Sequence, residues 1–114
     1  MTGVQTCALP ISSVLTNMVT SIEQHVEWTA RCIEHVRAGG YESIEATAAA
    51  EDEWVAHVNE VADGTLFPRG NSWYLGANIP GKERVFMPYA GGFATYEDTC
   101  EQVAADDYRG FLLK

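Results

Sequence analysis

The sequence has few basic side chains, no long apolar run and no glycine motif of the kind that holds a nucleotide. It carries 7 Lys and Arg against 16 Asp and Glu, a formal net charge of -9. Because binding to phosphates needs clustered cations, we expect neither nucleic acid nor an anionic membrane surface as a partner. No apolar run approaches the roughly 20 residues of a membrane helix. The sequence also lacks G-x-G-x-x-G, the motif whose backbone binds the phosphates of a dinucleotide.

Cysteine is also scarce. Cys7, Cys32 and Cys100 are odd in number and follow no recognisable spacing, and no basic start followed by an apolar core indicates secretion. These features predict a reducing, cytoplasmic location. G-x-S-x-G is missing too, which argues against a serine nucleophile on a sharp turn. At 114 residues, the chain has room for one small domain.

The first eleven residues differ from the rest. Residues 1–11, MTGVQTCALPI, have no charged side chain and no amphipathic period. They resemble a peptide that arises when sequencing-adapter DNA is read as coding sequence. We therefore treat residues 1–11 as a non-native leader and expect the true reading frame to extend further upstream.

Two helices are predicted in the first half of the chain. Ser21 and Gln24 form a capping-box pattern that opens the first, which ends at Gly39-Gly40. Its apolar stripe consists of Ile22, Val26, Thr29, Ile33 and Val36. The second is expected to begin near Tyr41 to Ser43 and to close before Gly64, and the two would form an αα-hairpin. Its apolar face consists of Ile44, Ala50, Trp54, Val58 and Val61.

The second half begins with an irregular segment that is rich in glycine and proline. It runs from Asn71 to Gly92 and contains a predicted short strand over 84–87. Thr95 is the predicted cap of a third helix that ends near Asp106. Its apolar positions are Tyr96, Cys100 and Val103, and an extended apolar tail follows. The predicted fold class is therefore a mainly α fragment: an αα-hairpin, an irregular loop, one short strand and a C-terminal helix.

Two motifs suggest chemistry but fail on closer inspection. Residues 76–82, GANIPGK, match half of a phosphate-binding loop, but Glu83 replaces the required hydroxyl and no helix follows. His25, Cys32 and His35 share one helix, yet His25 is too far along it to join the other two at one ion. We predict no metal site.

The aromatic residues fall into two groups. Trp28, Trp54, Phe86 and Tyr96 lie on apolar faces and are expected in the core. Trp73 instead lies in the irregular loop near Asn71 and Asn78, where its indole N–H could reach a polar ligand. The residues alone leave ligand binding and simple packing open for Trp73.

The loop also carries a resemblance to a known family. SWYLGANIPGK followed by RVFMPYAGGF resembles the C-terminal region of the Baeyer–Villiger monooxygenases, which are FAD- and NADPH-dependent flavoproteins. SVLTNM, SIEQHVEW, EDEWVAHVNEVAD and EQVAADDYRGF resemble the same family in the same order. The resemblance covers residues 13–113.

The resemblance implies a piece of a larger α/β protein with two dinucleotide-binding domains. Residues 12–114 would form the C-terminal part of its FAD-binding region. The whole protein would insert one oxygen of O2 beside the carbonyl of a ketone or aldehyde, giving an ester or lactone. FAD and NADPH would both need the missing upstream domains, and the family's catalytic arginine also lies upstream. This chain alone is therefore expected to be inactive, with no catalytic residue of its own.

The resemblance also assigns roles to particular positions. Trp73 matches a tryptophan of the mobile loop that folds over NADP. Asn17 and Met18 match the segment that passes the flavin ring. Further residues of the substrate side and the gating loop are Leu15, Thr16, Asn71, Ser72, Tyr74, Asn78 and Lys82.

The sequence also leaves two other functions open. The chain could be a self-standing acidic helical module that binds a protein through Trp73, Tyr74 and its apolar tail. Within the flavoproteins, the parent could be an N-hydroxylating or sulfide-oxygenating monooxygenase. Only the sequence upstream would separate that last possibility from ketone oxygenation.

Overall fold

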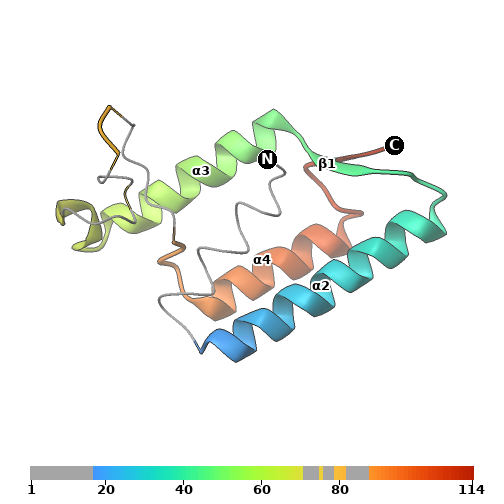
Figure 1. Cartoon of the computed structure of the whole chain (residues 1–114), viewed down its shortest axis with the longest axis horizontal. Helices are drawn as coiled ribbons and strands as arrows, with labels where there is room; N and C mark the ends of the chain where they lie inside the picture. The colour runs from blue at the N-terminus through green and yellow to red at the C-terminus, as the bar shows by residue number, and fades with distance from the viewer. Residues whose placement is uncertain (1–16, 71–74, 76–78, 82–87) are drawn as a thin grey trace.

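The computed structural model describes residues 17–70, 75, 79–81 and 88–114, and helices make up most of this part. The elements are α2 (Met18–Ala38), β1 (Ile44–Ala46), α3 (Ala48–Asp63), the 3-10 turn η1 (Phe67–Arg69), α4 (Phe93–Ala105) and β2 (Phe111–Leu113). Helices α2 and α4 lie side by side, while the strands lie at one end of the molecule (Figure 1). The predicted mainly α class is confirmed.

Helix α2 begins one turn earlier than predicted. Its N-cap is Asn17, whose Oδ1 accepts a hydrogen bond from the Val19 backbone N–H at 3.0 Å. Asn is as good an N-cap as Ser, so the capping box at Ser21 was a misleading signal. Ser21 and Gln24 instead lie inside the helix and are buried. The predicted end is confirmed, because Gly39 caps the helix.

The buried side of α2 is not its apolar stripe. The residues that this helix buries are Ser21, Gln24, Trp28 and Cys32. Trp28 and Cys32 pack with Tyr108, and Trp28 Nε1 donates a hydrogen bond to the Cys100 carbonyl oxygen at 2.9 Å. These contacts turn the helix so that Ile22, Val26 and Ile33 face outward.

A strand stands where the second helix was predicted to begin. β1 pairs with β2 in antiparallel register, with Ile44 opposite Leu113 and Ala46 opposite Phe111. Thr47 then caps α3, its Oγ1 accepting from the Ala50 N–H at 3.2 Å. The predicted αα-hairpin is therefore corrected: β1 separates α2 from α3, and α2 packs on α4. The strand partner is distant in sequence, which is why local propensity missed it.

Helix α4 starts at Phe93, two residues before the predicted cap, and follows Gly92 at φ +88°. Its predicted inner face is confirmed, since Tyr96 is buried and Cys100 and Val103 pack on the core. The predicted strand over 84–87 lies outside the described residues.

The turn after α4 completes the packing. Asp107 and Tyr108 both have positive φ, a conformation that costs free energy for residues with a side chain. The Tyr108 ring offsets that cost through two contacts. It packs edge-on against Trp28, with ring centroids 5.4 Å apart, and it lies tilted against His35, with centroids 4.8 Å apart. None of the helices in the described ranges combines the length and the apolar character needed to cross a bilayer.

Candidate functional site

The site residues inferred from the sequence fall mostly outside the described part. Asn17 and Met18 are described: they form the exposed start of α2, and Met18 is 53% exposed. The other assigned positions lie outside the described residues, namely Leu15, Thr16, Asn71, Ser72, Trp73, Tyr74, Asn78 and Lys82. The structure describes two residues after Trp73 that anchor the irregular segment on α3, Leu75 and Tyr89.

The first anchor of this loop is Leu75, two residues after Trp73. Its side chain is 4% exposed and packs against Ala62, near the end of α3, and against Ala90. Ala62 is itself almost completely buried, so its small side chain is what lets the loop approach the helix. Leu75 is therefore a fixed point of the segment that follows Trp73 in the sequence.

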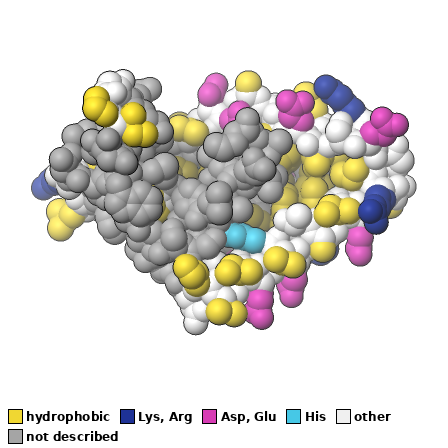
Figure 2. All heavy atoms as spheres, viewed as in Figure 1, with side chains coloured by type: hydrophobic (Ala, Val, Ile, Leu, Met, Phe, Trp, Pro, Cys, Tyr) yellow, Lys and Arg dark blue, Asp and Glu magenta, His cyan; other side chains and the backbone are white. Residues whose placement is uncertain are grey.

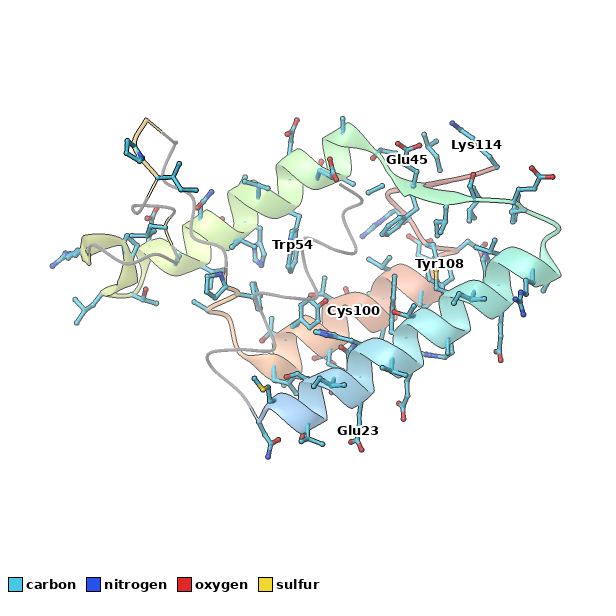
Figure 3. All side chains as sticks on the ribbon, in the orientation of Figure 1. Glu23, Glu45, Trp54, Cys100, Tyr108 and Lys114 are labelled. Carbon is cyan, nitrogen blue, oxygen red and sulfur yellow. The ribbon has the colours of Figure 1, made fainter. Side chains whose placement is uncertain are left out.

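The second anchor is Tyr89, where the loop returns to the helices. Its ring stacks on the ring of Trp54, which Figure 3 labels, with the centroids 5.3 Å apart. The Tyr89 Oη lies 3.2 Å from His57 Nε2. Val58 and Tyr96 complete the cluster around it. Burial raises the pKa of Tyr89, which keeps the hydroxyl protonated. Trp54 and Tyr96 thus belong to the core, as predicted.

Two glycines connect this anchor to α4. A Cβ on Gly91 would lie 2.4 Å from the Tyr89 ring, so only glycine allows the ring to fold back there. Gly92 has φ +88°, which other residues rarely adopt. The pair therefore fixes the direction in which the loop enters α4.

Sequence reasoning missed Leu75, Tyr89 and Ala62. A usable signal was present: Leu75 and Tyr89 are apolar residues inside a segment of glycine and proline, where solvated loops have few of them. The partner positions on α3 could not be found this way, because loop-to-helix packing has no fixed spacing in sequence.

The side-chain amide of Gln24 is a buried polar group between α2 and α4. Gln24 is 7% exposed and its amide lies beside the Cys100 thiol, a weak partner. Among the described residues, neither atom of this amide makes a full hydrogen bond, nor does His25 Nε2. Burial lowers the pKa of His25, which favours its neutral ring, and the ring meets Tyr96 edge-on.

Replacing Gln24 by methionine should therefore not destabilise this chain. The two side chains are similar in length, and the change removes two buried polar atoms that lack full partners, so the free energy of unfolding should stay equal or rise by about 1 kcal/mol. Urea unfolding followed by circular dichroism measures this. Glu23→Met, at the exposed neighbouring position, is the matched control, and a loss of more than about 1 kcal/mol at Gln24 alone would contradict the expectation.

Cys32, His35 and His57 lie in packing positions. Cys32 and His35 pack around Tyr108, and His57 lies against Tyr89. Within the described ranges, no three His, Cys, Asp or Glu side chains lie close enough together to hold a metal ion.

Comparison with known proteins gives relatives of much greater length. No family model matches the chain. The acetone monooxygenase (methyl acetate-forming) of Gordonia sp. strain TY-5 is 46% identical over 110 residues, which are 95% of this chain and 21% of that protein. A Baeyer–Villiger monooxygenase of Pseudooceanicola batsensis is 41% identical over 97 residues, which are 85% of this chain and 18% of that protein.

Solved structures show the same relation. Cyclohexanone monooxygenase from Rhodococcus sp. Phi1, bound to NADP+, superposes with a TM-score of 0.80 at 42% identity, over 87% of this chain and 19% of that one. A structure named OTEMO, in complex with FAD and NADP, gives a TM-score of 0.72 at 31% identity, over 85% of this chain and 17% of that one. The chain thus spans about a fifth of the length of the proteins it matches.

Proposed function

The chain belongs to the Baeyer–Villiger monooxygenase family, and we propose that residues 12–114 are the C-terminal part of the FAD-binding region of an NADPH-dependent member. The observation that carries this proposal is similarity along nearly the whole chain, in sequence and in backbone at once. The proposed reaction of the complete protein is the insertion of one oxygen atom of O2 beside a ketone or aldehyde carbonyl. FAD, when bound and reduced by NADPH, supplies that chemistry.

The residues of this chain fit a covering role around the cofactors. The sequence contains no glycine-rich phosphate cradle, so the pyrophosphates of FAD and NADP would be held elsewhere in the protein. What the chain offers is the exposed start of α2, with Met18, and a loop pinned at Leu75 and Tyr89. A loop with both ends fixed on a helix can close over a bound molecule and exclude water from it.

Trp73 is the residue that we propose contacts NADP. It lies two residues before Leu75, which is buried against Ala62. An indole presents an apolar face together with one N–H donor, which suits the ribose of a nucleotide. Asn71, Ser72, Tyr74, Asn78 and Lys82 would form the rest of the gate, and Leu15, Thr16, Asn17 and Met18 would lie on the flavin side.

A chimeric protein, which we call the joined protein, tests this function. Residues 12–114 would replace the matching fifth of the Gordonia acetone monooxygenase, and NADPH oxidation would be followed with acetone and with cyclohexanone, together with product analysis. We expect bound FAD and ketone-dependent turnover from the joined protein, and neither from the 114-residue chain alone. Turnover by the isolated chain, or a joined protein that binds FAD but oxygenates neither ketone, would overturn the proposal.

Trp73→Ala in the joined protein should raise the KM for NADPH by roughly tenfold, since a lost hydrogen bond and lost packing together cost about 1.5 kcal/mol. Trp73→Phe keeps a ring but removes the N–H donor, and should give a smaller increase. If both variants keep the KM of the parent, Trp73 does not contact the nucleotide.

A further inference from the structure

One face of α2 carries a stripe of large apolar side chains that are exposed in the described part of the chain. Val19 is 65% exposed, Val26 is 61% exposed, and Ile22 and Ile33 are each 49% exposed. Hydrophobic side chains gather along the edge of the molecule that α2 forms (Figure 2). Single exposed apolar residues are ordinary on protein surfaces, but a continuous stripe along one helix is not. We call Val19, Ile22, Val26 and Ile33 the outer stripe.

The outer stripe is separate from the side that α2 buries. At about 100° per residue, its centre lies roughly 130° around the helix axis from the side that holds Trp28 and Cys32. The third side carries Glu23, Glu27 and Glu34, and all three are exposed. A helix with one charged side and two apolar or buried sides is typical of a helix covered from two directions. Among the described elements, α4 packs on the side that holds Trp28 and Cys32.

We propose that the outer stripe of α2 docks against an apolar surface of the remaining four-fifths of the same polypeptide. This inference rests on the proposed function, because it takes the chain as one part of a longer flavoprotein. The relatives are about five times as long as this chain, so most of the polypeptide lies outside the structure. The four stripe residues carry no charge, which calls for an apolar partner surface.

A second copy of the chain fits the stripe less well. The formal net charge of the chain is -9, and Glu23 and Glu27 flank the stripe. Two copies that meet through α2 would bring these carboxylates together and would repel one another. A covalently continuous partner also needs no association between separate molecules, because its effective concentration is high.

Thiol accessibility tests the proposal with a mild substitution. Val26→Cys places a thiol on the stripe, and Glu27→Cys places one on the charged side of the same turn. In the isolated chain both should react readily with a maleimide, whereas in the joined protein the thiol at position 26 should react at least tenfold more slowly and that at 27 at an unchanged rate. Peptide mapping separates these thiols from the native cysteines. Equal rates at position 26 in both proteins would overturn the proposal.

A charged substitution gives an independent readout. Val26→Lys should leave the melting temperature of the isolated chain unchanged, but should lower the melting temperature and FAD content of the joined protein, while Glu27→Lys should lower neither. If the lysine is tolerated equally at both positions, the stripe faces solvent in the whole protein. If the isolated chain is a dimer in sedimentation that Val26→Lys dissociates, the occupant is a second copy and our assignment is wrong. The proposed function is judged separately, by ketone turnover in the unsubstituted joined protein.

Discussion

Replacing Trp28 by alanine is expected to unfold this chain or to bring it close to unfolding. Trp28 is 9% exposed and joins three elements: it lies on α2, donates a hydrogen bond to α4 at the Cys100 carbonyl, and packs on Tyr108 and Phe111. Truncation of a buried tryptophan costs about 3–5 kcal/mol. Single domains have total stabilities of about 5–15 kcal/mol, and for a chain as short as this one, at the lower end of that range, the loss would remove most of the stability.

The comparison with Trp28→Phe separates the ring from its hydrogen bond. Phenylalanine keeps most of the apolar packing against Tyr108 but leaves the Cys100 carbonyl without its side-chain donor, for an expected loss of about 1–2 kcal/mol. Thermal unfolding followed by circular dichroism gives both values. Should Trp28→Ala melt within a few degrees of the parent, the packing of α2 on α4 through this residue would be refuted.

The second large effect is expected at Tyr89. Alanine there would leave a cavity beside Trp54, Val58 and Tyr96, at a cost of about 3–5 kcal/mol. The change would also free the end of the segment after Leu75, which carries the proposed gate residues Asn78 and Lys82. In the joined protein we therefore expect Tyr89→Ala to raise the KM for NADPH, in addition to its effect on stability.

Tyr89→Phe is the matched control, because it removes only the contact with His57 Nε2. A loss of about 1 kcal/mol is expected, with the KM for NADPH unchanged. Urea unfolding of the isolated chain and NADPH titration of the joined protein give the two readouts. If Tyr89→Ala lowered stability without affecting the KM, the ring would be part of the core alone and would not position the loop.

The helices could be predicted largely because their signals are local. Gly39 ends α2 and Gly64 ends α3 as the sequence indicated, and the spacing of Tyr96, Cys100 and Val103 identified the inner face of α4. The start of α2 was misplaced because two capping patterns, at Asn17 and at Ser21, compete within one turn. Local sequence cannot decide between them.

The orientation of α2 and the strand β1 could not be predicted for a different reason. The sequence shows a clear apolar stripe on α2, yet Trp28 and Cys32 form the buried side. Hydrophobic periodicity alone predicts that the more regular stripe is buried, whereas the folded chain buries the side of α2 that carries the Trp28 indole. Strand β1 exists through its pairing with residues 111–113, and no local pattern encodes that contact.

The candidate site was predictable only through the resemblance. Composition left ligand binding and packing equally open for Trp73, and the loop has no residue spacing that specifies a nucleotide. The structure adds what the resemblance did not contain, namely the anchors at Leu75 and Tyr89 on α3. They follow from tertiary packing, which depends on residues far apart in sequence.

The pairing of β1 with β2 has a consequence for the order of folding. Ile44 lies opposite Leu113, so β1 lacks its partner until nearly the whole chain has been synthesised. Contacts between such distant segments form slowly, because a long loop must close first. On the ribosome, α2 and α3 can become helical early. The Trp28 indole can be buried only after Cys100, Tyr108 and Phe111 have been synthesised. We therefore expect residues 108–113 to complete the core last. Nascent chains stopped before residue 108 should expose Trp28.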